Sequence, residues 1–105
     1  MGYIPMFEIR VSDVYRNWES GLKDKRARAT IAARVIRLAG GNPGDARSVG
    51  GGVSELRIHY GPGYRVYFAR RGTAIVLLLC GGDKSTQARD IIRAKELAAD
   101  KEVSE

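Results

Sequence analysis

The residues best suited to chemistry lie between positions 55 and 68, where the chain reads ELRIHYGPGYRVYF. Two runs rich in β-forming residues flank a Gly-Pro-Gly turn, which predicts a β-hairpin. A tight turn at residues 61–63 pairs residues whose numbers sum to 124, and any other even sum leaves the same side chains on each face. One face is then a hydrophobic wall of Leu56, Ile58, Tyr60, Tyr64, Val66 and Phe68. The opposite face holds Arg57, His59, Arg65 and Tyr67.

This polar face has the side chains needed to cleave RNA without a metal ion. The ribose 2′-hydroxyl attacks its own phosphate, which requires a base, an acid and cations that stabilise the charge on the phosphoryl oxygens. His59 is a candidate for the base, because histidine is the side-chain type whose unperturbed pKa lies near neutral pH. Arg57 and Arg65 can hold phosphate oxygens in a fork, and Tyr67 can stack on a base or donate a hydrogen bond. The polar side of a plain, half-exposed hairpin is the alternative interpretation.

A second candidate is the sequence CGGDKST, residues 80–86, between a predicted strand and the last predicted helix. Backbone N–H groups and Lys84 could meet an anion at the N-terminus of that helix. Asp83 interrupts the Gly-Lys-Ser order and the spacer after a first glycine is missing, which excludes a nucleotide-hydrolysing loop. For Lys84 the plain alternative is a surface lysine at the start of a helix.

Other cations are candidates for RNA binding. On a predicted helix at residues 23–41, four of them fall within a quarter-turn of one another beside the apolar stripe: Lys23, Arg26, Arg34 and Arg37. Arg47 joins them from residues 42–54, a glycine-rich stretch that we interpret as a loop with a short extended piece at 47–49. A solvated helix surface is the alternative interpretation of the four helical cations.

Composition narrows the possible partners. The net charge is +6, and residues 1–95 hold 17 basic and 8 acidic groups, whereas the last ten residues hold one Lys and four acids. A body this basic attracts polyanions such as nucleic acid, although the same charge also favours solubility. Cys80 and His59 are the only residues of their types, so neither an internal disulfide nor a Cys/His zinc cage can be assembled. We expect no metal or cofactor, no membrane segment and a cytoplasmic location.

The remaining segments predict an α+β fold in a single domain. We expect strands at residues 3–11, 54–60, 64–70 and 73–80, and helices at residues 12–22, 23–41 and 83–100. Pro5 hints at a sheet edge. The apolar run at residues 74–80 predicts a central strand covered on both faces. The helices are expected on one side of an antiparallel sheet, with the other face open. Residues 1–99 form the domain, and residues 100–105 form a short acidic tail.

Three segments carry a resemblance to a known family: RARATIAARVIRLAGGNPGD, VSELRIHYGPGYRVYF and IVLLLCGGDKSTQARDI. Together they closely resemble toxins of the RelE/ParE superfamily, specifically the HigB-like or phage Gp49-like branch of addiction-module killer proteins, over about residues 7–98. The resemblance implies a RelE-like fold, in which a small antiparallel sheet carries an N-terminal helical hairpin on one face and a C-terminal helix. It also implies a toxin neutralised by an antitoxin encoded beside it.

The antitoxin in this branch is commonly a helix-turn-helix protein that also represses the operon, so operator DNA would be reached only through the complex. The free toxin typically stops translation by cleaving mRNA in the ribosomal A site. Family ribonucleases stabilise the phosphate transition state with an arginine that matches Arg65. They place basic residues on the preceding strand, where Arg57 and His59 match, and after the last strand, where Lys84 is the nearest match. Their C-terminal-helix tyrosine is missing here, which favours His59 as the base.

The sequence is therefore compatible with three functions. The first is a ribosome-dependent mRNA endonuclease. The second is a toxin without enzymatic activity that poisons DNA gyrase, as the ParE arm of the superfamily does. The third is a basic module that binds its antitoxin and operator DNA.

Overall fold

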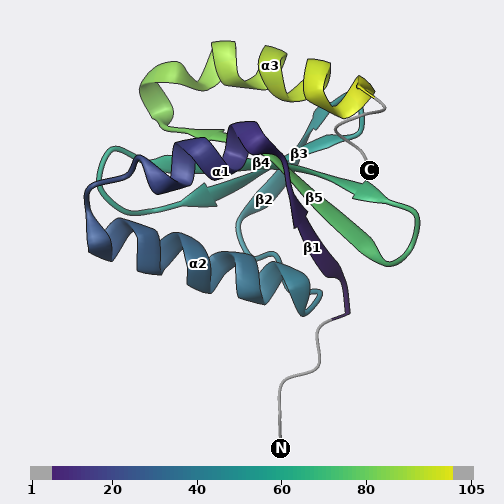
Figure 1. Ribbon diagram of the computed structural model, residues 1–105, viewed down its shortest axis with the longest axis horizontal. Coiled ribbons are helices and arrows are strands. Elements are labelled where there is room, and N and C mark those ends of the chain that lie inside the picture. The colour runs from purple at the N-terminus through teal and green to yellow at the C-terminus, as the bar shows by residue number, and fades with distance from the viewer. Residues whose placement is uncertain (1–5, 101–105) are drawn as a thin grey trace, which may run out of the picture.

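The computed structural model describes residues 6–100 (Figure 1). Over that range the chain forms β1 (Glu8–Val11), α1 (Asp13–Ser20), α2 (Lys25–Ala39), β2 (Ala46–Gly50), β3 (Val53–Ile58), β4 (Tyr64–Arg71), β5 (Ile75–Gly82), a short 3₁₀ helix η1 (Lys84–Thr86) and α3 (Gln87–Ala99). The fold is therefore α+β, as expected. None of the helices between residues 6 and 100 is both long and apolar enough to span a bilayer.

The strands form one sheet in the order β1-β5-β4-β3-β2. β2, β3, β4 and β5 are antiparallel neighbours, but β1 runs parallel to β5, with Glu8 beside Ile75 and Val11 beside Leu78. The expected antiparallel sheet is thus corrected to a mixed one. The direction of β1 depends on the strand that it neighbours, and this neighbour is more than 60 residues away in sequence.

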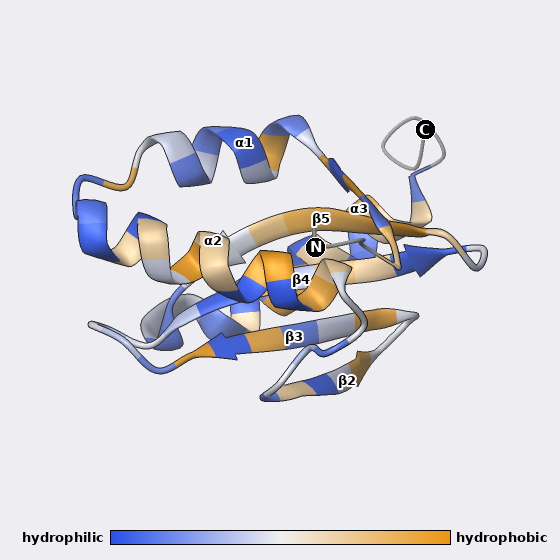
Figure 2. Cartoon of the chain, turned by 90° about the horizontal axis from the view of Figure 1, so that it is seen from below, coloured by the Kyte–Doolittle hydropathy of each residue, from blue (hydrophilic) through white to orange (hydrophobic). Residues whose placement is uncertain are grey.

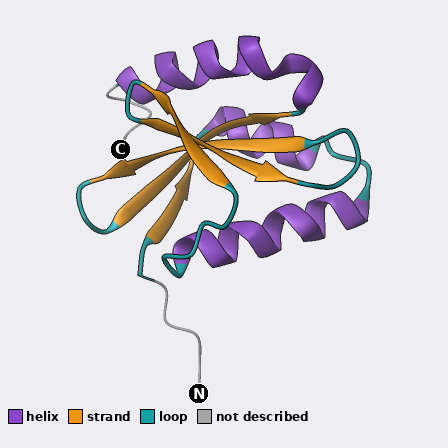
Figure 3. Ribbon diagram, turned by 180° about the vertical axis from the view of Figure 1, so that it is seen from behind, coloured by secondary structure: helices purple, strands orange, loops and turns teal. Residues whose placement is uncertain are grey.

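Helices cover both faces of the sheet, which corrects the expected open face. Figure 3 shows the strands between α2 and α3. On one face, α1 and α2 contribute Tyr15, Ile31 and Leu38 to a core with Leu56 and Phe68. On the other face, α3 packs Ala94 and Leu97 against Val53, Ala69, Leu77 and Leu79. This second layer explains the continuous apolar run of β5, visible in Figure 2, although β4 and not β5 is the middle strand.

The hairpin of β3 and β4 has the expected faces in a shifted register. Leu56 pairs with Val66 and Ile58 pairs with Tyr64, so paired numbers sum to 122 rather than 124. The sum is still even, and the predicted hydrophobic wall does lie in the core shared with α1 and α2. The shift places His59 and Tyr60 outside the strand ladder, because the turn is longer than expected.

Several element boundaries also differ from the expected ones. The short extended piece expected at 47–49 within residues 42–54 is confirmed, but it is longer, because β2 spans Ala46–Gly50 and pairs with β3; Gly51 and Gly52 make the turn with positive φ. Among the described residues the first strand begins at Glu8; Pro5 and the rest of residues 3–5 lie outside the described range, as do residues 101–105 of the expected tail. α2 begins at Lys25 because the carboxylate of Asp24 accepts from the backbone N–H groups of Arg26 and Ala27.

Candidate functional site

Two arginines of the hairpin face each other on the α3 side of the sheet. Arg57 on β3 and Arg65 on β4 are direct partners in the antiparallel ladder. Like charges placed opposite each other in a sheet repel, so such a pair needs an anion nearby. Glu55 supplies that anion.

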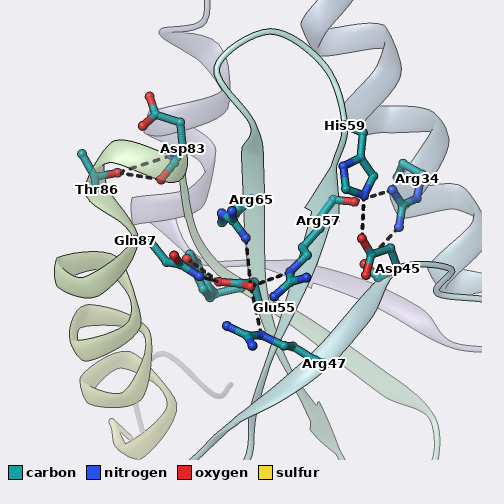
Figure 4. A network of polar contacts seen from close by, with 11 residues as sticks. Arg34, Asp45, Arg47, Glu55, Arg57, His59, Arg65, Asp83, Thr86 and Gln87 are labelled. Carbon is teal, nitrogen blue, oxygen red and sulfur yellow. Dashed lines mark hydrogen bonds and ion pairs between the residues drawn. The ribbon is translucent and has the colours of Figure 1, made fainter.

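Glu55 lies on β3, two residues before Arg57, and is fully buried. Figure 4 shows three guanidinium groups around its carboxylate. The Oε1 atom of Glu55 lies 3.2 Å from Arg57 Nε, 3.1 Å from Arg65 Nη1 and 3.5 Å from Arg47 Nε. We call Arg47, Arg57, Arg65 and Glu55 the arginine cluster. Its three cations and one carboxylate carry a net charge of +2.

The second carboxylate oxygen of Glu55 is held from the other side. The Tyr67 hydroxyl donates to Oε2 at 3.0 Å, and Gln87 Nε2 donates to the same atom at 2.9 Å. Tyr67 comes from β4, and Gln87 is the first residue of α3. The two carboxylate oxygens therefore have different partners: Oε2 accepts from neutral donors, and Oε1 faces the arginines.

These contacts set the protonation state of the buried groups. Burial alone would raise the pKa of Glu55, but hydrogen bonds from Gln87, Arg57 and Tyr67 and the charge of Arg65 outweigh it and lower the pKa. Burial, followed by the hydrogen bond to Glu55, raises the pKa of Tyr67 far above its ordinary value. At neutral pH Glu55 is therefore a carboxylate, and the Tyr67 phenol beside the cluster is neutral.

The three arginines of the cluster differ in their exposure to solvent. The side chain of Arg65 is 13% exposed, that of Arg57 is 32% exposed and that of Arg47 is 55% exposed. A guanidinium group has five N–H donors, so one contact with Glu55 leaves further donors for a ligand. The arrangement can hold an anion between fixed cations at the surface of the sheet.

His59 is not part of this cluster. It follows the last residue of β3, its side chain is 76% exposed, and its Nε2 atom lies 2.6 Å from Asp45 Oδ2. Figure 4 shows this pair apart from Glu55. The backbone carbonyl oxygen of Asp45 accepts from the backbone N–H of Arg57 at 2.9 Å, which connects the residue before β2 to the end of β3. The structure thus places His59 beside the cluster rather than within it.

Tyr67 cannot stack on a base as the sequence suggested. Its side chain is fully buried beneath α3, where it packs with Val53 and Leu79. The alternation that brought it to the polar face was interpreted correctly, but the expected exposure was wrong because α3 covers this part of the sheet. The Tyr67 hydroxyl instead donates a hydrogen bond to Glu55.

Lys84 is exposed and is the first residue of η1. It lies next to the hairpin turn, because a Cβ atom built on Gly63 would be 3.5 Å from the Cβ atom of Lys84. The anion site expected at the helix N-terminus is not supported. The carboxylate of Asp83 already accepts from the backbone N–H of Ser85 at 2.8 Å, and the Thr86 hydroxyl donates to Asp90. An anion would meet two carboxylates there.

The cations of the second helix divide into two groups. Arg34 is half-buried, and its Nη2 donates to the carbonyl oxygens of Pro43 at 2.9 Å and Asp45 at 3.3 Å, while its Nη1 donates to that of Arg57. These contacts give Arg34 a structural role. Three others are exposed: Lys23, which precedes α2, and Arg26 and Arg37. α2 packs on the sheet face opposite the arginine cluster.

Glu55 was missed by sequence reasoning, although a signal was present. It lies two positions before Arg57, so strand alternation places it on the cationic face. The register then puts it between Arg47 on β2 and Tyr67 on β4. An acid among cations on an inner strand is the pattern that could have identified it. Among the described residues, no group of three or more His, Cys, Asp or Glu side chains is placed to hold a metal ion.

Comparison with known proteins gives two matches. The family model described as "Phage derived protein Gp49-like" matches residues 20–101, a range that includes the whole arginine cluster, His59 and Lys84. A protein of Haemophilus influenzae described as "Uncharacterized protein" is 52% identical over 91 residues, which cover 87% of this chain and 92% of the relative. No solved structure gives a significant match.

Proposed function

Because this chain belongs to the Gp49-like family of phage-derived proteins, the addiction-module killer group, we propose that it is the toxin of a type II toxin–antitoxin system and cuts mRNA on the ribosome. The family implies a toxin and a cognate antitoxin. The endonuclease activity is the part that the site supports. Its main support is the arginine cluster, in which three guanidinium groups surround one buried carboxylate at the surface of the sheet.

The charge of the cluster suits the transition state of RNA cleavage. When the 2′-oxygen attacks the phosphate, the phosphodiester changes from one negative charge to nearly two. A cluster with a net charge of +2 favours the more highly charged state, and fixed cations stabilise it without reorganising. Arg57 and Arg65 then hold the non-bridging phosphoryl oxygens. The products are a 2′,3′-cyclic phosphate and a free 5′-hydroxyl.

His59 and Lys84 flank the hairpin turn and complete the proposed site. His59 takes the proton of the 2′-hydroxyl after its ring has turned from Asp45 toward the bound RNA. Lys84 lies beside the same turn and is our candidate for the general acid that donates a proton to the leaving 5′-oxygen. Four of the exposed cations, Lys23, Arg26, Arg37 and Arg47, would contact RNA phosphates on the ribosome.

One observation favours the second candidate function, a toxin that poisons DNA gyrase without cleaving nucleic acid. His59 contacts Asp45 rather than the guanidinium groups, so the proposed base must approach the phosphate when RNA binds. For either toxin we propose a cytoplasmic location and a helix-turn-helix antitoxin through which operator DNA is bound.

The test maps the 5′ ends of mRNA in growing cells that express the toxin. Wild-type toxin should give cuts in phase with codons. Arg65→Lys and Arg57→Ala should abolish them, because neither variant keeps the paired forks. His59→Ala should reduce them by about 100-fold, the range of general base catalysis. Arg16→Ala changes an exposed arginine on α1 and is the matched control.

Thermal unfolding of each purified variant separates loss of cleavage from loss of fold. Growth arrest with intact mRNA and broken DNA would replace the endonuclease by the gyrase poison. Purified RNA without ribosomes should be cut weakly or not at all. Efficient cutting of such RNA would contradict the dependence on the ribosome.

A further inference from the structure

We propose that Glu55 is a positioning residue, which holds the guanidinium groups of Arg57 and Arg65 in the geometry that meets an RNA phosphate, and that it takes no proton from the substrate. The inference rests on the proposed endonuclease function, but the arrangement that it describes can be tested without any RNA. It assigns a role to the one fully buried carboxylate among the described residues.

The two carboxylate oxygens of Glu55 have different partners, and this difference supports the role. Tyr67 and Gln87 hold Oε2 at 3.0 Å and 2.9 Å, which fixes the rotation of the carboxylate. Oε1 then points toward the arginines and is shared between them. Tyr67 belongs to β4 and Gln87 to α3, so two rigid elements determine where the charge lies.

The arginines need such a support. Arginine side chains are long and lose conformational entropy when they are ordered, and Arg57 and Arg65 also repel each other as direct neighbours in the ladder. The shared contact with Glu55 brings both guanidinium groups to fixed positions before RNA arrives. Preorganised cations need not move as charge develops on the phosphate, which is where electrostatic catalysis gains its effect.

The same geometry argues against Glu55 as the base. The side chain of Glu55 is fully buried, and both of its oxygens already accept hydrogen bonds, Oε1 from Arg65 and Oε2 from Gln87. A base must come within hydrogen-bond distance of the 2′-hydroxyl. To reach Glu55, the substrate would have to displace the arginines that are expected to bind its phosphate.

The direct test is nuclear magnetic resonance of arginine Nε–H groups in Glu55→Gln, with Glu96→Gln on the exposed face of α3 as the control. In the wild type, the Nε–H of Arg57 donates to Glu55 at 3.2 Å and should exchange slowly with water. Glu55→Gln should accelerate that exchange by about tenfold or more, because a charged acceptor is replaced by a neutral one. Glu96→Gln should leave it unchanged. Unchanged exchange in Glu55→Gln would overturn the proposal.

Kinetics of ribosome-bound mRNA cleavage supply the second readout. Glu55→Gln should lower kcat by about 10- to 100-fold, with a smaller change in KM, because the phosphate carries most charge in the transition state. The pH dependence of kcat should keep its shape. Loss of a limb of that profile would identify Glu55 as the base and refute a positioning role.

A third variant covers the case in which Glu55→Gln does not fold. Gln87→Ala removes one donor to Oε2 and leaves the arginines in place, so it should change the exchange and kcat in the same direction by smaller factors. If Gln87→Ala changes neither, the hydrogen bond from α3 does not fix the carboxylate, which would refute the proposal that Tyr67 and Gln87 position it together. If the wild type itself cuts no mRNA, the proposed function fails, whereas the exchange measurements still decide the role of Glu55.

Discussion

Arg57 and Arg65 are direct partners across the β3–β4 ladder, although both carry a positive charge. The pair is compatible with the fold because the Glu55 carboxylate lies within 3.2 Å of one guanidinium group and 3.1 Å of the other. Buried charges are tolerated when they are paired and hydrogen-bonded, and removing one partner leaves the rest uncompensated. The stability of the fold and the proposed phosphate site therefore depend on the same carboxylate.

Stability should depend on pH through Glu55. Its pKa is lowered in the folded chain, so the folded state binds its proton less readily than the unfolded state. The stabilisation is complete above the ordinary value of 4.5 and is lost as the pH falls through the lower folded value. Glu55→Gln should cost about 3 kcal/mol at pH 7, and the difference from wild type should shrink below pH 4.5.

Urea denaturation of both proteins between pH 3 and pH 7, followed by circular dichroism, measures this difference. All other carboxylates are common to the two proteins and cancel in the comparison. A difference in unfolding free energy that stays constant over the whole range would show that Glu55 does not titrate as described.

Removal of the Tyr67 hydroxyl should destabilise the fold by about 2 kcal/mol, because the hydroxyl donates to a buried charge. Tyr67→Phe keeps the ring and its packing, so the loss isolates the hydrogen bond. Tyr60→Phe is the matched control: its hydroxyl donates to Asp24 at 2.9 Å in an exposed place, and its loss should be smaller. Equal unfolding free energies for the two variants would argue against a special role of the buried bond.

Arg34 should be structural and Arg37 dispensable for stability. Arg34→Ala removes donors to three backbone carbonyl groups and should lower the unfolding free energy by about 2 to 4 kcal/mol. Arg34→Lys should not restore it, since lysine lacks the planar fork. Arg37→Ala, one helical turn further along an exposed face, should change it by no more than about 0.5 kcal/mol. A larger effect for Arg37→Ala than for Arg34→Ala would reverse this assignment.

Gly81 is required by close packing and not by an anion. A Cβ atom there would lie 2.3 Å from the Trp18 ring, so Gly81→Ala should cost about 1 to 3 kcal/mol and move the ring toward water. Trp18 is the only tryptophan, which makes a red shift of its fluorescence a specific readout. Gly21→Ala meets only ordinary contacts at φ −81° and should leave both stability and fluorescence nearly unchanged. An unshifted spectrum in Gly81→Ala would refute the packing explanation.

The sequence by itself determined the faces of the hairpin. Side chains alternate along a strand whatever its partner is, so Leu56 and Val66 had to share one face and Arg57 and Arg65 the other. A shift of the register by two residues left this division intact. The family resemblance likewise needed only the order of residues, and the family match confirms the Gp49-like branch.

The tertiary structure decided which of those polar residues act together. α3 packs on the face that was expected to be open, which buries Tyr67 and brings Gln87 to Glu55. The length of the turn separates His59 from the ladder and pairs it with Asp45. These outcomes depend on register, turn length and packing between segments far apart in the chain. Local periodicity carries no information on any of the three, because it repeats along one strand and does not specify what lies against it.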